Sequence, residues 1–170
     1  MINVKLWLTV VCLVPLMSLQ AQTTDPAYGQ LLEKMYRKTV PLLTVGQAAR
    51  LQARDKQVLF LDTREKAEYQ VSHIKDAVWV GYRDFSLQRL AGIPRQTPVV
   101  VYCSVGYRSE KIGEKLLQAG FTNVHNLYGS IFEWVNQGYP VYDAKGRPTT
   151  RVHAYSRSWG IWLSRGTKVY

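Results

Sequence analysis

The chain has 170 residues, of which 46% are apolar and 20% charged, proportions that exclude collagen-like, low-complexity and wholly disordered proteins and predict one domain. Lysine and arginine total 22 against 12 aspartates and glutamates, and the resulting net charge of +10 favours anionic ligands or surfaces. Two cysteines are too few for a disulfide-stapled scaffold or a cysteine-rich zinc site.

Residues 1–21 have the pattern of a secretory signal peptide. A short, positively charged start is followed by 14 apolar residues, 6–19, and the small Ala21 offers a cleavage point before Gln22. The apolar run is short for a membrane-spanning helix, which needs about 20 residues. We expect export to the periplasm or the cell exterior through a cleaved signal, with an uncleaved anchor as the alternative. Cleavage would remove Cys12 and leave Cys103 as the single thiol.

Residues 22–43 are predicted to form a spacer that is polar through Gly29 and continues into a short helix over 31–36. Thr44 and Gln47 have the spacing of a capping box, in which the two side chains satisfy the first free backbone N–H groups of a helix. We therefore expect a helix from this point to about Arg54.

The rest of the chain alternates between apolar strands and amphipathic helices. The expected strands are 58–61, 77–80, 99–102 and 124–127, and the expected helices are 64–70, 85–90, one that follows Ser109 and ends before Gly120, and 131–137. This alternation predicts an α/β sandwich around a mainly parallel sheet. Ligands of such sheets bind beyond the carboxyl ends of the strands, which is where Cys103 falls.

The loop between the strand at 99–102 and the next helix carries the candidate chemistry. Backbone N–H groups and the positive end of the helix favour the thiolate form of Cys103, as does the cationic Arg108. Gly106 allows a tight turn without a side-chain clash. The alternative is a buried structural cysteine that ends a core strand. The combination of Gly106, Arg108 and a following helix favours the functional interpretation.

This loop resembles the active-site loop of rhodanese-domain sulfurtransferases, whose single-domain members often show C-x-x-G-x-R-[SA]. The matching residues are Cys103-Ser104-Val105-Gly106-Tyr107-Arg108-Ser109. The resemblance extends over residues 44–142 and includes Asp62-Thr63-Arg64-Glu65, which match the family's D-x-R-E. The chain departs from the family's glycine-rich turns at Ser72, Lys75, Asp76 and Ser130.

The resemblance implies a rhodanese-like three-layer sandwich at 44–142, with helices on both faces of the sheet. Cys103 would be the nucleophile and carry sulfur as a persulfide, while the loop from Ser104 to Ser109 would bind the substrate. The implied substrates are a small anionic sulfur donor such as thiosulfate and a thiophilic acceptor, which is cyanide in the assay reaction. No metal or organic cofactor is implied.

The spacing of the loop disfavours a phosphatase. Tyrosine phosphatases need five residues between cysteine and arginine to wrap a phosphate, whereas four separate Cys103 from Arg108. We interpret Asp62 and Arg64 as a structural brace, with orientation of the active loop as the alternative role.

Residues 143–170 extend beyond the usual end of the domain. From Ala144 on they contain six cationic residues and no acidic one, interleaved with Tyr155, Trp159, Trp162 and Tyr170. We expect an arm packed back on the domain, with buried aromatic and solvated charged side chains. Contact with an anionic membrane surface or a partner protein is the alternative. Nucleic acid is disfavoured because the chain carries a predicted secretory signal.

Two functional classes remain open. The first is an exported sulfurtransferase that uses a Cys103 persulfide. The second is a rhodanese-like module that binds a partner or senses oxidants without turnover. Intact Cys103, Gly106 and Arg108 favour the enzyme, because degenerate modules commonly lack the cysteine.

Overall fold

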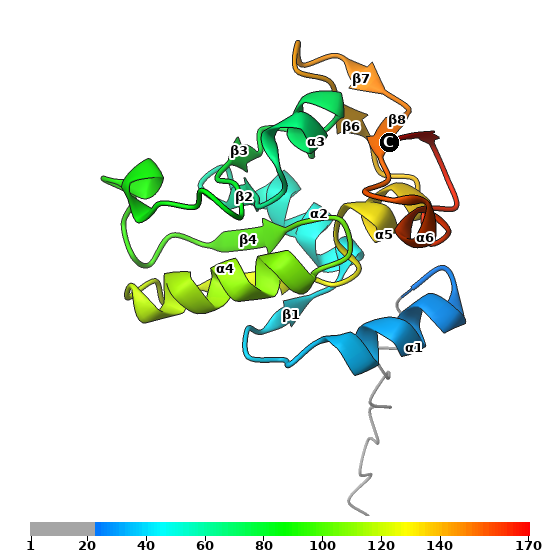
Figure 1. Cartoon of the computed structure of the whole chain (residues 1–170). Helices are drawn as coiled ribbons and strands as arrows, with labels where there is room; N and C mark the ends of the chain where they lie inside the picture. The colour runs from blue at the N-terminus through cyan, green and yellow to red at the C-terminus, as the bar shows by residue number, and fades with distance from the viewer. Residues whose placement is uncertain (1–22) are drawn as a thin grey trace, which may run out of the picture.

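The computed structural model describes residues 23–170, and the predicted signal peptide lies outside the described residues (Figure 1). A five-stranded sheet forms the centre, in the order β1-β5-β4-β2-β3, and every neighbouring pair is parallel. The strands are β1 (Leu42–Leu43), β2 (Leu59–Asp62), β3 (Val78–Trp79), β4 (Val99–Tyr102) and β5 (Val124–Leu127). The predicted parallel α/β sheet is confirmed.

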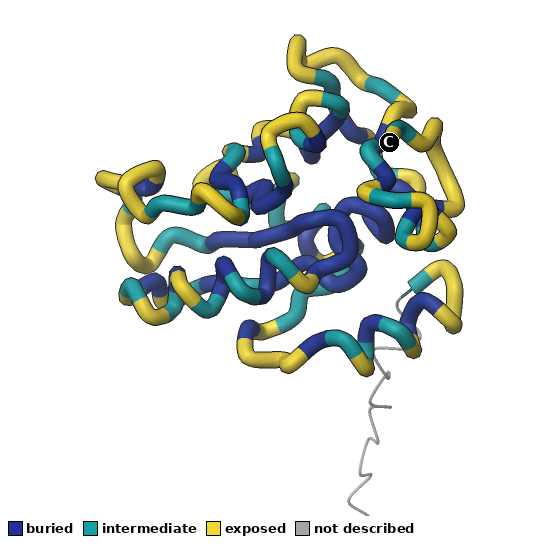
Figure 2. The backbone as a smooth tube through the Cα atoms, viewed as in Figure 1, coloured by how far each residue is buried: buried dark blue, intermediate teal, exposed yellow. Residues whose placement is uncertain are grey.

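Strand β4 lies at the middle of the sheet and is buried on both faces (Figure 2). Its side chains alternate between two apolar clusters, as strand geometry requires. Val100 and Tyr102 belong to one cluster, while Val99 and Val101 belong to the other. The continuous apolar run that predicted this strand therefore reflects a core on either side of it.

Helices cover both faces of the sheet. The helical elements of the domain are α2 (Val45–Arg54), α3 (Lys66–Val71), the 3-10 helix η2 (Leu87–Leu90), α4 (Tyr107–Gln118) and α5 (Ser130–Asn136). Helix α4 and η2 pack into the cluster of Val99 and Val101, and α2 and α5 pack into the opposite one. The predicted capping box is present, since the Gln47 N–H donates to Thr44 Oγ1 and the Thr44 N–H donates to Gln47 Oε1.

The N-terminal helix begins earlier than predicted. Helix α1 (Pro26–Met35) is capped by Asp25, whose carboxylate accepts a hydrogen bond of 2.8 Å from the Ala27 N–H. Tyr28 and Leu32 are fully buried against the core. The expectation of a polar spacer through Gly29 is therefore wrong from Pro26 on, because α1 is an integral part of the packed domain.

The C-terminal arm follows β6 (Val141–Tyr142) and packs against α5. Its short elements are β7 (Pro148–Thr149), β8 (Arg151–His153), α6 (Arg157–Gly160) and β9 (Thr167–Val169). Asn136 holds the arm, because its side chain donates to the Trp162 carbonyl and accepts from the Ser164 N–H. The arm is packed back as predicted. Of the four aromatic residues expected to be buried, Trp159 and Trp162 are partly buried against the core, while Tyr155 and Tyr170 are about half exposed, so the expectation is wrong for the two tyrosines. No helix within residues 23–170 is long and apolar enough to cross a membrane.

Candidate active site

Cys103 lies just beyond the carboxyl end of β4, where the chain turns into α4. Its side chain is 1% exposed, and the Gly106 N–H donates a hydrogen bond of 3.1 Å to its Sγ. Gly106 has a φ of 108°, which lets the loop turn back towards the sulfur immediately before α4 begins. Amide N–H groups at the start of a helix favour an anion, so this geometry forms a cradle for a negatively charged sulfur.

The start of α5 fixes the first half of the loop. The Cys103 N–H donates to Ser130 Oγ over 3.1 Å, and the N–H groups of Ile131 and Phe132 donate to the carbonyls of Cys103 and Ser104. Ser130 has a φ of 53°, the left-handed conformation that glycine adopts most easily. The serine that departs from the family pattern thus supplies a hydrogen bond that a glycine could not.

The second half of the loop is fixed by two polar side chains from other parts of the core. Tyr36 Oη donates to the Val105 carbonyl, and Asn126 Nδ2 donates to the Gly106 carbonyl over 3.0 Å. Ser109 Oγ in turn donates to Asn126 Oδ1 over 2.7 Å. Each loop carbonyl therefore has a partner, and the loop N–H groups stay directed at the sulfur.

The environment of Cys103 favours its thiolate. Burial raises the pKa of the thiol, but the Arg108 charge and the N–H groups of Ser109, Gly106 and Val105 lower it by more. The net result is a pKa below the ordinary value for cysteine. A buried thiol that is nevertheless readily ionised is typical of a reactive cysteine rather than a structural one.

Arg108 is held by an acidic residue that local sequence patterns did not indicate. Its guanidinium makes a two-point ion pair with Glu68 of α3, with Nη1–Oε2 at 2.7 Å and Nη2–Oε1 at 2.8 Å. It also donates to Ser104 Oγ over 3.0 Å. Burial raises the pKa of Glu68, but hydrogen bonds and charge from Arg108, together with Arg64, lower it to about 2. Glu68 is therefore ionised, and it compensates the charge of Arg108.

Asp62 and Arg64 lie one layer behind this pair and do not reach the pocket above Cys103. Both side chains are fully buried, and Arg64 Nη2 donates to Asp62 Oδ2 and to the Ser72 carbonyl, each over 2.6 Å. This arrangement ties the end of β2 to the end of α3, the helix that carries Glu68. The pair thus acts through the position and charge of Glu68.

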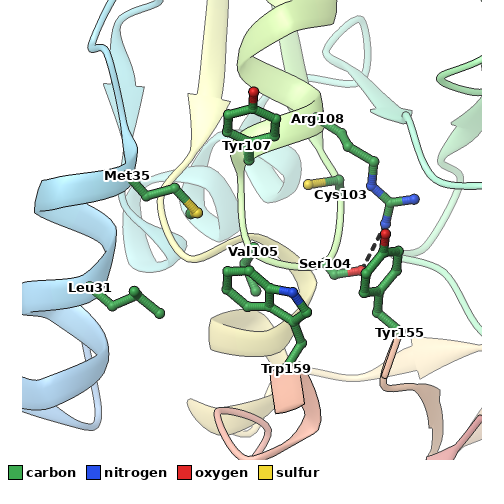
Figure 3. Close-up of a pocket in the computed structure, with 9 residues that line it drawn as sticks. All are labelled: Leu31, Met35, Cys103, Ser104, Val105, Tyr107, Arg108, Tyr155 and Trp159. Carbon is green, nitrogen blue, oxygen red and sulfur yellow. Dashed lines mark hydrogen bonds between the residues drawn. The ribbon is translucent and has the colours of Figure 1, made fainter. Parts of the chain in front are cut away.

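A pocket of about 350 Å³ opens directly above Cys103 (Figure 3). Its floor and one side come from the loop and the start of α4, through Cys103, Ser104, Val105, Tyr107 and Arg108. Two further walls come from outside the central α/β unit. Helix α1 contributes Leu31 and Met35, and the C-terminal arm contributes Tyr155 and Trp159.

The two outer walls support each other and cover the cation. Tyr28 of α1 stacks on Trp162 of the arm, with ring centroids 5.5 Å apart. The Tyr155 ring lies 5.0 Å from the guanidinium carbon of Arg108, within the range of a cation–π interaction. The pocket is therefore flanked by aromatic and aliphatic side chains from both ends of the described chain.

The predicted residues of the cysteine loop occupy two roles in this structure. Five line the pocket: Cys103, Ser104, Val105, Tyr107 and Arg108. Gly106 and Ser109 act from behind, through the hydrogen bond to Sγ and the contact with Asn126. Sequence reasoning missed Glu68, Tyr36 and the pocket walls of α1. It noted Tyr155 and Trp159 as tail aromatics, without connecting them to the cysteine.

The described residues provide no evident metal site. Within residues 23–170, no group of three or more histidine, cysteine, aspartate or glutamate side chains is arranged to hold a metal ion. Cys103 is a free, buried thiol. The site itself contains a thiol with a lowered pKa, an ion-paired arginine and backbone N–H groups.

Comparison with known proteins identifies the family and the relatives that this chain resembles. A family model described as "Rhodanese-like domain" matches residues 44–137. A sulfurtransferase of Allochromatium vinosum is 35% identical over 89 residues, which cover 52% of this chain and 82% of that protein. The tRNA uridine(34) hydroxylase of Hamiltonella defensa is 36% identical over 87 residues, 48% of this chain. The matched part is 24% of that hydroxylase's length.

Solved structures show the same fold. A rhodanese-related protein of Thermoplasma volcanium aligns with a TM-score of 0.52 at 25% identity, covering 59% of this chain and 96% of that one. The thiosulfate sulfurtransferase of Pseudomonas aeruginosa aligns with a TM-score of 0.57 at 26% identity, covering 81% of this chain and 26% of that one. Helix α1 and the C-terminal arm lie outside the residues that the family model matches.

Proposed function

The chain belongs to the rhodanese-like domain family, and from that premise we propose that it is a sulfurtransferase that carries sulfane sulfur on Cys103. One observation supports this proposal above the others. The Cys103 thiol lies at the floor of a pocket, in a loop whose N–H groups and Arg108 lower its pKa. A sulfur nucleophile needs this combination of ionisation and substrate access.

The first half-reaction loads the cysteine. The Cys103 thiolate attacks the outer sulfur of a donor such as thiosulfate. A bond forms between Sγ and that sulfur, the bond from that sulfur to the sulfonate group breaks, and sulfite leaves with the electron pair. The N–H groups of the loop stabilise the resulting persulfide anion, because their dipoles are already oriented towards it.

The second half-reaction discharges the cysteine. A thiophilic acceptor, cyanide in an assay, attacks the outer sulfur of the persulfide and leaves as thiocyanate, which regenerates the thiolate. Because the two substrates react in separate steps through a covalent intermediate, ping-pong kinetics are expected.

Intact-protein mass spectrometry tests the mechanism. Incubation with a sulfur donor should add the mass of one sulfur atom, and cyanide should remove it. Cys103→Ser should show no gain while its far-UV circular dichroism spectrum matches the parent. A gain that persists in Cys103→Ser would contradict the role of this thiol. No gain with any donor would instead favour a module that binds a partner or senses oxidants.

The cellular location of the protein is a separate part of the proposal. The apolar run at 6–19 and Ala21 support export through a cleaved signal, which lies outside the described residues. Fractionation of expressing cells, with mass determination of the mature protein, should find a chain that begins at Gln22 outside the cytoplasm. A full-length chain confined to the cytoplasm would overturn the proposed export.

A further inference from the structure

We propose that the preferred sulfur donor is an organic persulfide, R–S–SH, whose apolar body R fills the pocket between α1 and the C-terminal arm. This inference rests on the proposed function, because it names the donor class for the same Cys103.

The walls of the pocket suit an apolar group. Leu31, Met35, Val105, Tyr155 and Trp159 all line it, so aliphatic, thioether and aromatic surfaces face the space above Cys103 (Figure 3). Its volume of about 350 Å³ lies in the range of organic-ligand sites, roughly 300–1,000 Å³. A small inorganic oxyanion would leave most of this space, and most of these side chains, without contact.

The outer walls of the pocket come from segments that lie outside the matched rhodanese-like domain. The family model ends at residue 137 and starts at residue 44, whereas the outer walls come from α1 and from residues 155–159. The Tyr28–Trp162 stack joins these two segments, so they form the outer walls of the pocket as one packed unit. The loop provides the sulfur chemistry, and the added segments provide most of the apolar lining.

The charges at the site disfavour a dianionic donor. Arg108 is the one cation among the described residues that line the pocket, and Glu68 already compensates it through two short contacts. Tyr155 covers the guanidinium from the pocket side at 5.0 Å. When Cys103 attacks as the thiolate, the formal charges of Arg108, Glu68 and Cys103 sum to −1, which disfavours the dianion thiosulfate more than a neutral or singly charged persulfide.

The transfer from a persulfide is balanced without a further reactant. The Cys103 thiolate attacks the outer sulfur of R–S–SH, and a new S–S bond forms at Sγ. The bond between that sulfur and R–S breaks, and the electron pair leaves as the thiolate R–S⁻, which takes up the proton. One S–S bond is formed for each one broken, so no oxidant or reductant is needed.

The test compares two persulfides that differ in their body. Benzyl persulfide presents an aromatic ring, whereas the persulfide of 2-mercaptoethanesulfonate presents a charged sulfonate. The readout is the rate at which the full chain gains one sulfur, divided by the rate of the same donor with a free low-molecular-weight thiol. We expect the normalised rate with benzyl persulfide to be at least about tenfold higher than with the sulfonate persulfide or thiosulfate.

Variants of the walls should change this preference selectively. Trp159→Ala and Leu31→Gln should each lower the benzyl persulfide rate by about tenfold and change the sulfonate persulfide rate little. Leu31 is partly exposed on α1, so its variant tests the wall without opening the core. Ile161→Ala is the matched control, because Ile161 is 65% exposed next to α6 and does not line the pocket.

The outcomes separate the two proposals. Equal normalised rates for all donors, or wall variants that affect them equally, would overturn the apolar donor while leaving the Cys103 persulfide in place. Absence of sulfur on Cys103 with every donor would overturn the sulfurtransferase function itself.

Discussion

Glu68 on α3 and Arg108 at the start of α4, 40 residues apart in sequence, form a largely buried two-point ion pair directly beside the reactive cysteine. Ser104 joins the pair through hydrogen bonds to both partners. The arginine thus serves two purposes: it lowers the pKa of Cys103, and it anchors the loop to α3. Because its charge is shared with Glu68, it is less available to an incoming anion.

Glu68→Gln should make the site more receptive to thiosulfate. The amide removes the negative charge that compensates Arg108, so we expect kcat/KM for thiosulfate to rise several-fold. The same change weakens a charge-assisted hydrogen-bond network, and the free energy of unfolding at pH 7 should fall by about 2 kcal/mol. Steady-state kinetics and urea denaturation measure the two effects. Unchanged thiosulfate kinetics would mean that Glu68 does not limit the response of Arg108 to anions.

The lowered pKa of Glu68 predicts how the free energy of unfolding depends on pH. Its pKa is lowered from 4.5 to about 2 in the folded protein. A depressed carboxyl pKa contributes stability that is complete above the unfolded value and disappears as the pH falls towards the folded value. The stability difference between the parent and Glu68→Gln should therefore shrink between pH 4.5 and pH 2. Denaturation at several pH values checks this, and a constant difference across that interval would contradict it.

The Cys103 thiol should have a pKa below that of an ordinary cysteine. The midpoint of its alkylation by iodoacetamide should lie at a lower pH in the folded protein than in the urea-unfolded protein, because the Arg108 charge and the loop N–H groups outweigh the effect of burial. Arg108→Ala should shift the midpoint upwards. The double variant with Glu68→Gln is the control, since it avoids leaving a buried carboxylate unpaired. An unshifted midpoint in both variants would remove Arg108 from thiolate stabilisation.

The regular part of the fold was predictable because its signals are local. Strands β4 and β5 lie at the predicted residues. The signal was strongest for β4, because a short apolar run that ends in turn residues leaves little choice of conformation. The capping box marked the first residue of α2 in the same way. By contrast, β1, β6 and β7 have two residues each, too few to show any periodicity. Strand β1 depends on the distant β5, whereas β6 and β7 pair with each other across a short loop.

The candidate site also contains some residues that local sequence patterns indicate and others that only tertiary packing brings together. The cysteine loop carries its turn glycine, cation and helix start within seven residues, so its chemistry could be inferred from spacing. Glu68 meets Arg108 only because α3 packs beside the loop, and no local pattern records that contact. Trp159 was visible as an aromatic residue in a basic tail, but its position over Cys103 depends on how the arm folds back onto α5.

Gly106→Ala should damage both the stability and the activity of the protein. Gly106 has a φ of 108°, and a Cβ atom there would overlap the Tyr36 hydroxyl that holds the Val105 carbonyl. Gly120→Ala is the matched control, because Gly120 has a φ of 89° but open space around it. The control should lose about 1–2 kcal/mol of stability from backbone strain alone. Gly106→Ala should lose more, because either Tyr36 or the loop must move.

Thiol reactivity and sulfur loading distinguish a displaced loop from a general loss of stability. Displacement of the loop withdraws the N–H group that contacts Cys103 Sγ, so the alkylation midpoint of Gly106→Ala should rise and its rate of sulfur loading should fall by at least about tenfold. Gly120→Ala should keep the parent values of both, because Gly120 lies at the far end of α4 from the cysteine. Equal losses in the two variants would show that the left-handed backbone alone, and not the contact with Tyr36, sets the shape of the loop.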